Sequence, residues 1–142
     1  MLDINKTTIE VRYQETDQMG VVYHANYLVW FEIGRSKYIK QLGFNYIEME
    51  KDNIVSPVID LQISYKRPAM YGDTVTIYTW LDSYTGIKTS YGYRIENDQG
   101  DILVTGKSDH VIVNKDTFKP LQLRKINPEW HEAYKKQIKG ES

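Results

Sequence analysis

The sequence predicts an α+β fold in which one long helix lies across one face of an antiparallel sheet. A helical pattern follows Asn26 and stops at Gly43, and four strand-like runs joined by short turns follow Pro57. A single long helix near the start of such a chain must cover a sheet face, which gives two layers. The 142 residues suit a single domain, 1–142, with one core.

The composition narrows the classes of function. Lys and Arg number 18, Asp and Glu number 19, and the net charge is −1, so electrostatics give no reason to expect a nucleic acid or a membrane surface as partner. The absence of cysteine excludes disulfides, thiolate nucleophiles and cysteine-based metal sites. The sequence has no apolar run long enough for a signal peptide or a spanning helix, so we expect a cytoplasmic protein without membrane insertion. His110 and His131 lack metal-ligand spacing, and we expect neither a metal nor another cofactor.

The first strand and the helix are separated by a turn-rich loop. Residues 7–13 alternate between apolar and polar side chains, as in a half-buried strand. The loop that follows holds a carboxylate, Asp17, and a flexible Gly20. This loop therefore places an acidic side chain just before a helix.

The helix is expected at about residues 27–42. Asn26 is a good N-cap, and Gly43 suits the left-handed residue after the last turn. Gly34 lies on the apolar stripe of this helix, where glycine costs about 1 kcal/mol relative to alanine. Its presence predicts that the helix approaches the sheet closely.

The remaining segments complete the two layers. Residues 45–52 form either a short second helix or an irregular connection. Strands are expected at 58–67, 73–84, 87–96 and 101–114. Because short turns join them, consecutive strands are expected to pair in an antiparallel meander. An amphipathic helix at about 128–139, with a proline in its first turn, is expected at the periphery.

Several motifs in this arrangement resemble one protein family. The most specific is TDQMGVVYHANYL at 16–28, and the supporting motifs are SYKRPA at 64–69 and VNKDTFKP at 113–120. Over about residues 7–125 the chain resembles the 4-hydroxybenzoyl-CoA thioesterase family of acyl-CoA hydrolases. The resemblance implies the hot-dog fold, a five-stranded antiparallel sheet wrapped around one long central helix, here followed by the C-terminal helix.

The resemblance also implies an active site at the start of the helix. Asp17 would attack the thioester carbon or act as a general base on water, and Tyr23 and His24 would complete the catalytic group. The backbone N–H groups of His24, Ala25 and Asn26 would polarise the thioester carbonyl, because free amides and the helix dipole favour negative charge there.

Substrate contacts and assembly follow from the same resemblance. Lys66, Arg67 and Lys88 would contact the phosphates of CoA, although each also suits a solvated strand edge. Val58 and Ile59 would face the active site of a partner subunit, since the acyl tunnel of the family runs between two protomers. We therefore expect a homodimer or a homotetramer.

Other interpretations stay open. Asp17 also suits a turn that satisfies local amides, and capping alone explains Asn26. His24 also suits a surface position at the start of the helix. An acyl-ACP thioesterase and a non-catalytic hot-dog acyl-binding protein remain alternatives to an acyl-CoA thioesterase.

Overall fold

The computed structural model describes residues 3–139, so positions 1–2 and 140–142 of the predicted domain lie outside the described residues. The strands are β1 (Asn5–Glu10), β2 (Ile54–Val55), β3 (Val58–Tyr65), β4 (Thr74–Tyr84), β5 (Lys88–Asn97), β6 (Ile102–Val111) and β7 (Val113–Asn114). The helices are α1 (Asn26–Gln41), α2 (Tyr46–Lys51), α3 (Leu123–Ile126) and α4 (Pro128–Lys139). Within the described residues, every helix is too short or too polar to cross a membrane.

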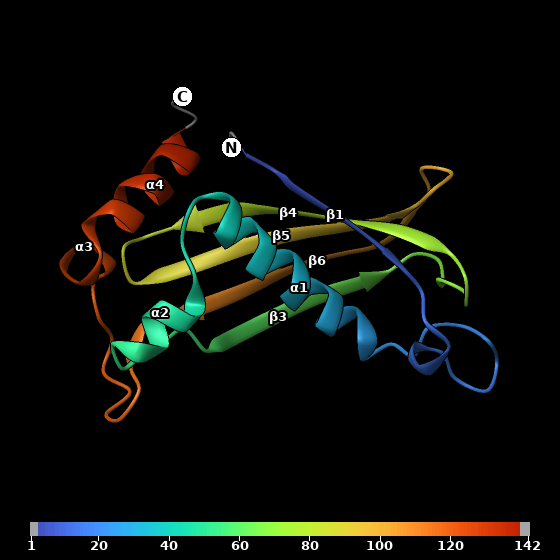
Figure 1. The fold of residues 1–142 in the computed structure, drawn as a ribbon, viewed down its shortest axis with the longest axis horizontal. Helices are drawn as coiled ribbons and strands as arrows, with labels where there is room; N and C mark the ends of the chain where they lie inside the picture. Colours follow the sequence, from blue (N-terminus) through green and yellow to red (C-terminus); the bar gives the residue numbers. More distant parts are fainter. Residues whose placement is uncertain (1–2, 140–142) are drawn as a thin grey trace.

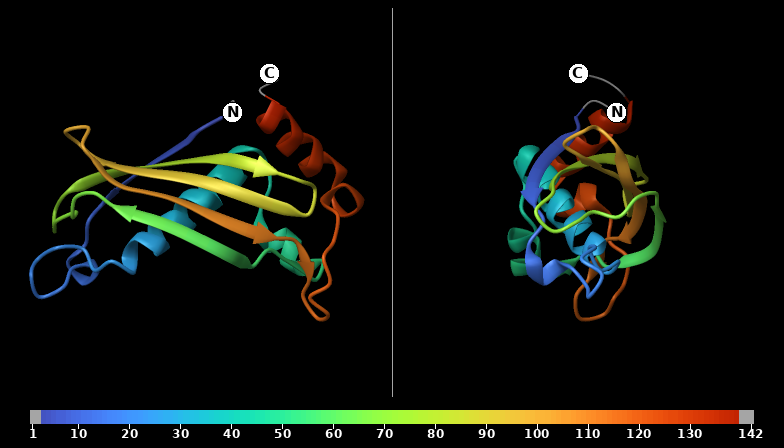
Figure 2. Two further views of the ribbon diagram at one scale, coloured as in Figure 1. Left: turned by 180° about the vertical axis from the view of Figure 1, so that it is seen from behind. Right: turned by 90° about the vertical axis from the view of Figure 1, so that its right-hand side faces the viewer.

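Five strands form one antiparallel sheet that curls around α1, as the sequence predicted (Figures 1 and 2). The order is β1-β4-β5-β6-β3, so the prediction of a meander through all four later strands is wrong for β3. β3 pairs with β6, and β1 takes the place beside β4. Residues 66–73 connect β3 to β4 and are long enough to cross from one edge of the sheet to the other. Only β4, β5 and β6 are joined by hairpins.

The helix α1 packs closely on the inner face of the sheet. Trp30, Phe31 and Tyr38 are almost fully buried beneath it. A Cβ atom at Gly34 would clash with the side chains of Thr79 and Ile77, which confirms the predicted close approach. The glycine therefore gives up helix propensity for contact with the sheet.

The ends of two predicted elements differ from the structure. β1 stops at Glu10, and Tyr13 lies in a 3-10 turn (Tyr13–Glu15) with 76% of its surface exposed, instead of facing the core. The C-terminal helix is less peripheral than expected, because α4 buries Trp130 and Tyr134. The Trp130 ring stacks on Phe44 at 4.9 Å between ring centroids.

The turns around α2 match the expected local chemistry. Residues 46–51 are helical, and the Asn45 side chain accepts a hydrogen bond from the Ile47 amide at 2.8 Å, as an N-cap does. Gly43 has a φ of +98°, the left-handed conformation predicted after the end of α1.

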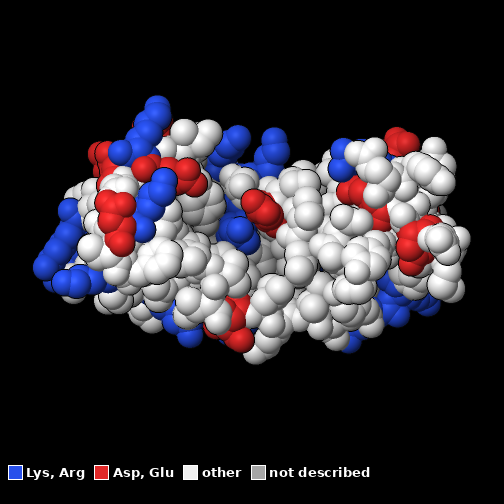
Figure 3. Space-filling view, turned by 90° about the horizontal axis from the view of Figure 1, so that it is seen from below, with Lys and Arg blue, Asp and Glu red and all other residues white. Residues whose placement is uncertain are grey.

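The edge strand β3 exposes large apolar side chains. Val58, Ile59 and Leu61 keep 51%, 54% and 39% of their surface accessible. Figure 3 shows the molecule from this side, with charged side chains gathered towards its two ends and sparse along its middle. An unpaired, apolar strand edge of this kind invites pairing with another strand.

Candidate active site

The loop before α1 is a tight antiparallel turn closed by backbone pairing. Thr16 forms a bridge with Val22, and the Asp17 amide donates to the Val21 carbonyl at 2.9 Å. Gly20 has a φ of +79°, which closes the turn and which most other residues resist. The loop therefore holds Asp17 on a defined backbone directly before the helix.

The Asp17 side chain is exposed and makes one local contact. Its Oδ1 accepts a hydrogen bond from the Met19 amide at 2.8 Å, which is the turn role that the sequence left open. Its Oδ2 accepts no hydrogen bond from residues 3–139. A carboxylate in this arrangement still has an oxygen available for a substrate or a water.

The start of α1 presents two free amides. The Asn26 and Tyr27 amides donate to the carbonyls of Tyr23 and His24, whereas the amides of His24 and Ala25 have no backbone acceptor in the described chain. The predicted donor set therefore shrinks, because the N–H of Asn26 is already used. These two unpaired donors lie at the positive end of the helix dipole.

Asn26 does not cap the helix. Ala25 occupies the N-cap position without a side-chain cap, and Asn26 is the first helical residue. The Asn26 side-chain amide instead donates to the Glu15 carbonyl at 2.8 Å. It ties the helix start back to the beginning of the loop.

Tyr23 and His24 are exposed side chains beside each other. Their ring centroids are 4.4 Å apart, and Tyr23 keeps 49% of its surface accessible. The His24 carbonyl accepts a hydrogen bond from the Tyr65 hydroxyl at 3.4 Å. This contact fixes the C-terminal end of β3 beside the helix start.

A pocket of about 220 Å³ opens at this junction. His24, Tyr65, Lys66 and Arg67 line it together with Val22, Tyr27 and Pro68. The structure thus brings two of the predicted basic residues to the same hollow as His24. Arg67 also pairs with Asp101 at 3.1 Å across a solvent-exposed contact.

The other predicted contact residues lie elsewhere in the same chain. Val58 and Ile59 begin β3, about 20 Å along the strand from Tyr65 at about 3.3 Å per residue. Lys88 begins β5 and pairs with Asp109 at 3.5 Å. One subunit alone therefore does not unite these residues with Asp17.

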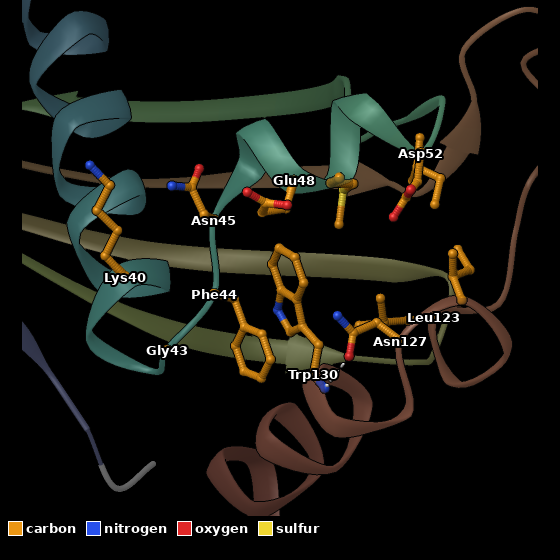
Figure 4. Close-up of a pocket in the computed structure, with 12 residues that line it drawn as sticks. Lys40, Gly43, Phe44, Asn45, Glu48, Asp52, Leu123, Asn127 and Trp130 are labelled. Atoms are coloured by element: carbon orange, nitrogen blue, oxygen red, sulfur yellow. Dashed lines mark hydrogen bonds between the residues drawn. The ribbon is translucent and has the colours of Figure 1, made fainter.

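A larger cavity, of about 440 Å³, lies at the opposite end of α1, between α2 and the helices α3 and α4 (Figure 4). Its apolar wall includes Met49, Leu123 and Trp130, and the carboxylates of Glu48 and Asp52 lie at its rim. Carboxylates repel the phosphates of CoA, so this cavity does not suit the carrier. The smaller pocket beside His24 fits the chemistry better.

A buried hydrogen-bond chain runs beneath the sheet, and the sequence gave no signal for it. The Arg35 guanidinium donates to the Tyr93 hydroxyl at 3.1 Å, and that hydroxyl lies 2.6 Å from Ser108 Oγ. Ser108 Oγ lies 2.8 Å from His110 Nε2, and His110 Nδ1 lies 3.1 Å from the Ser56 carbonyl. Arginine can only donate and a carbonyl can only accept, so the protons of the whole chain point one way and His110 is neutral, with its proton on Nδ1.

Comparisons with known proteins agree with this architecture. The family model of the thioesterase superfamily matches residues 19–104, beginning just after Asp17. A Bacillus subtilis protein named "Putative acyl-CoA thioesterase YneP" is 54% identical over 95% of this chain and 98% of its own length. The Escherichia coli acyl-CoA thioester hydrolase YbgC is 28% identical over 82% of this chain and 87% of its own.

A solved structure shares the whole arrangement. The DHNA-CoA thioesterase of Staphylococcus aureus is 46% identical and superposes with a TM-score of 0.91, covering 94% of this chain and 89% of that one. The curled five-stranded sheet around α1 is thus the fold of a known thioesterase. Because the family model covers more than half of the chain and the B. subtilis relative matches nearly all of it, the chain belongs to the thioesterase superfamily of hot-dog enzymes.

Proposed function

We propose that this protein hydrolyses acyl-CoA thioesters to the free acid and CoA at the loop before α1. The observation that carries the proposal is the pair of unpaired amides, His24 and Ala25, at the helix start beside the loop that holds Asp17. In the reaction, an oxygen nucleophile adds to the thioester carbon, the C–S bond breaks and the CoA sulfur leaves as a thiol.

The two free amides suit the oxygen of the thioester carbonyl. Negative charge grows on that oxygen as the nucleophile adds, and preorganised N–H donors stabilise it most in the transition state. One such donor contributes about 2.7–4 kcal/mol to the barrier. The dipole of α1, whose 16 residues point their N–H groups towards this end, acts in the same direction.

Asp17 supplies the nucleophile or activates it. Its free Oδ2 either attacks the thioester carbon to form an anhydride that water then cleaves, or takes a proton from the attacking water. His24 would orient the substrate or return a proton to the leaving thiol. Both routes use the same loop geometry.

The basic side chains beside His24 suit the carrier. Lys66 and Arg67 line the pocket of about 220 Å³, and their charges match the phosphates of CoA. Arg67 can exchange its exposed contact with Asp101 for a phosphate at little cost, because exposed ion pairs contribute only about 0–1 kcal/mol.

The site is completed by a second subunit in this proposal. Tyr65, at the C-terminal end of β3, touches His24 of its own chain. If two β3 edges pair antiparallel about a two-fold axis, the N-terminal end of one strand lies beside the C-terminal end of the other. Val58 and Ile59 of one subunit would then face the catalytic loop of its partner, which explains why they are exposed and apolar. The dimer is the minimum assembly in this proposal, and the expected tetramer stays a prediction.

The relatives indicate which acyl groups to test first. The S. aureus structure at 46% identity is of a DHNA-CoA thioesterase. We therefore propose aromatic acyl-CoA thioesters, and 1,4-dihydroxy-2-naphthoyl-CoA first, as substrates of this chain. The many tyrosines that surround α1 provide stacking surfaces for an aromatic acyl group.

The test is release of free CoA from a panel of aromatic and straight-chain acyl-CoA esters, followed with a thiol-reactive dye. The chain has no cysteine, so the protein itself gives no background. The proposal expects saturable hydrolysis of at least one ester, fastest with aromatic groups. Absence of CoA release from every ester would refute the function, and preference for straight chains would refute only the substrate class.

A further inference from the structure

Glu15 is a buried acid that the proposed chemistry does not use. It is 5% exposed, and it is the one carboxylate among the buried residues of the described chain. It lies two residues before Asp17. A buried carboxylate is costly unless its oxygens are hydrogen-bonded, so its contacts indicate what it does.

Both carboxylate oxygens of Glu15 are taken by donors. Oε1 accepts from the Arg12 amide at 2.8 Å, with the Arg12 guanidinium 3.4 Å away, and Oε2 accepts from the Trp30 indole N–H at 2.7 Å. An amide N–H and an indole N–H can only donate, so the side chain must be ionised to accept both. Burial acts to raise the pKa of Glu15, but the hydrogen bonds from Arg12 and Trp30 outweigh it and hold the pKa below its usual value.

The main chain of Glu15 makes two further contacts. Its carbonyl accepts from the Tyr23 amide at 2.9 Å and from the Asn26 side chain at 2.8 Å. Residue 15 is therefore bonded to the end of the loop and to the first residue of α1. Its side chain is bonded to Trp30, one turn farther along the same helix.

We propose that Glu15 is a positioning residue that sets the spacing between Asp17 and the amides of His24 and Ala25. The inference rests on the proposed function. Through its carboxylate and its carbonyl, Glu15 fixes both ends of the loop to α1. A loop released from this anchor lets the carboxylate and the two amides drift apart, and a misplacement of about 1 Å can cost about 100-fold in rate.

Glu15→Gln tests the anchor with almost no change of shape. One carboxyl oxygen becomes an NH₂ group that faces another N–H, so either Arg12 or Trp30 loses its acceptor. We expect kcat to fall by about 10- to 100-fold, while KM, set by contacts with the carrier, changes less than about twofold. Trp30→Phe, which removes the indole donor, should shift kcat in the same direction.

The control is Glu10→Gln. Glu10 is an exposed acid at the end of β1, and its side chain makes no hydrogen bond or ion pair within residues 3–139. Its substitution should leave kcat and KM unchanged. Hydrogen exchange of the Tyr23 amide, which is bonded to Glu15, reports the anchor without any substrate: it should quicken in Glu15→Gln and stay the same in Glu10→Gln.

The deciding experiment is a double-mutant cycle with Asp17→Asn under single-turnover conditions. If Glu15 acts through the placement of Asp17, Glu15→Gln slows the wild type but has little further effect once Asp17 is replaced. An equal fold-loss in both backgrounds, or an unchanged kcat in folded Glu15→Gln, overturns the inference while the thioesterase function stands. If Glu15→Gln fails to fold, Trp30→Phe takes its place in the cycle. If the wild type releases no CoA at all, the proposed function fails and this inference falls with it, whatever the exchange data show.

Discussion

The neutral His110 in the buried chain beneath the sheet should make the protein sensitive to mild acid. His110 is fully buried, and burial, followed by the nearby charge of Arg35, lowers its pKa to about 4 from an ordinary value of 6.5. Between these values the unfolded chain binds a proton that the folded chain does not. Stability from this group is therefore present above pH 6.5 and is lost as the pH falls towards 4.

The size of the effect follows from the two pKa values. A difference of one in pKa corresponds to about 1.4 kcal/mol, so a group that titrates at 6.5 unfolded and about 4 folded loses about 2.5 kcal/mol between pH 7.5 and pH 4.5. This is a large part of the 5–15 kcal/mol that stabilises a typical domain. Other groups also respond to acid, including Glu15 and Asp109, whose pKa values are lowered, but they are present in a His110 variant as well.

The assay is urea unfolding of the wild type and of His110→Gln at pH 7.5 and pH 4.5, followed by tryptophan fluorescence at one fixed protein concentration. Gln is polar and does not titrate, so the variant should lose about 2.5 kcal/mol less than the wild type over this range. His24→Gln, which removes an exposed histidine, controls for the substitution itself. Equal losses in the wild type and in His110→Gln would refute the reasoning.

Three further predictions concern the surface, the helix and the pocket. Ile59→Lys should turn the dimer into a monomer in light scattering, because it places a charge in the proposed β3 interface, whereas Ile102→Lys, at an exposed isoleucine on β6, should not; a dimeric Ile59→Lys would contradict the shared site. Gly34→Ala should lower the free energy of unfolding by about 1–3 kcal/mol in urea titrations, since the new methyl group clashes with the sheet; a gain in stability would mean that the helix can move. Replacing both Lys66 and Arg67 by Gln should raise KM for acyl-CoA by about 10-fold or more and lose most of its salt dependence, whereas an unchanged KM would place the CoA phosphates elsewhere.

Local sequence signals predicted the helix α1 and its surroundings well. Asn45 and Gly43 act through their own backbone geometry, so position in the sequence is enough to assign them. Gly34 was also readable, because an apolar helix stripe has few other uses for a glycine.

Pairings between distant residues could not be read in the same way. The length of residues 66–73 permits either a hairpin or a crossover, and only packing against α1 decides that β3 joins the far edge of the sheet. Asn26 has the side chain of an N-cap, but the Glu15 carbonyl competes for its amide and wins. The partners of Glu15 and His110 are likewise set by the fold, since Trp30 and Ser56 lie 15 and 54 residues away in the chain.

The central claim is that Asp17 performs the chemistry beside the free amides of α1. Its most direct test is the kcat of Asp17→Asn on the fastest ester of the panel, with Asp98→Asn, at an exposed turn between β5 and β6, as the matched control. The proposed mechanism predicts a loss of at least about 100-fold for Asp17→Asn, the scale expected when a general base is removed, with KM nearly unchanged and no loss for Asp98→Asn. A kcat for folded Asp17→Asn within about threefold of the wild type would contradict it.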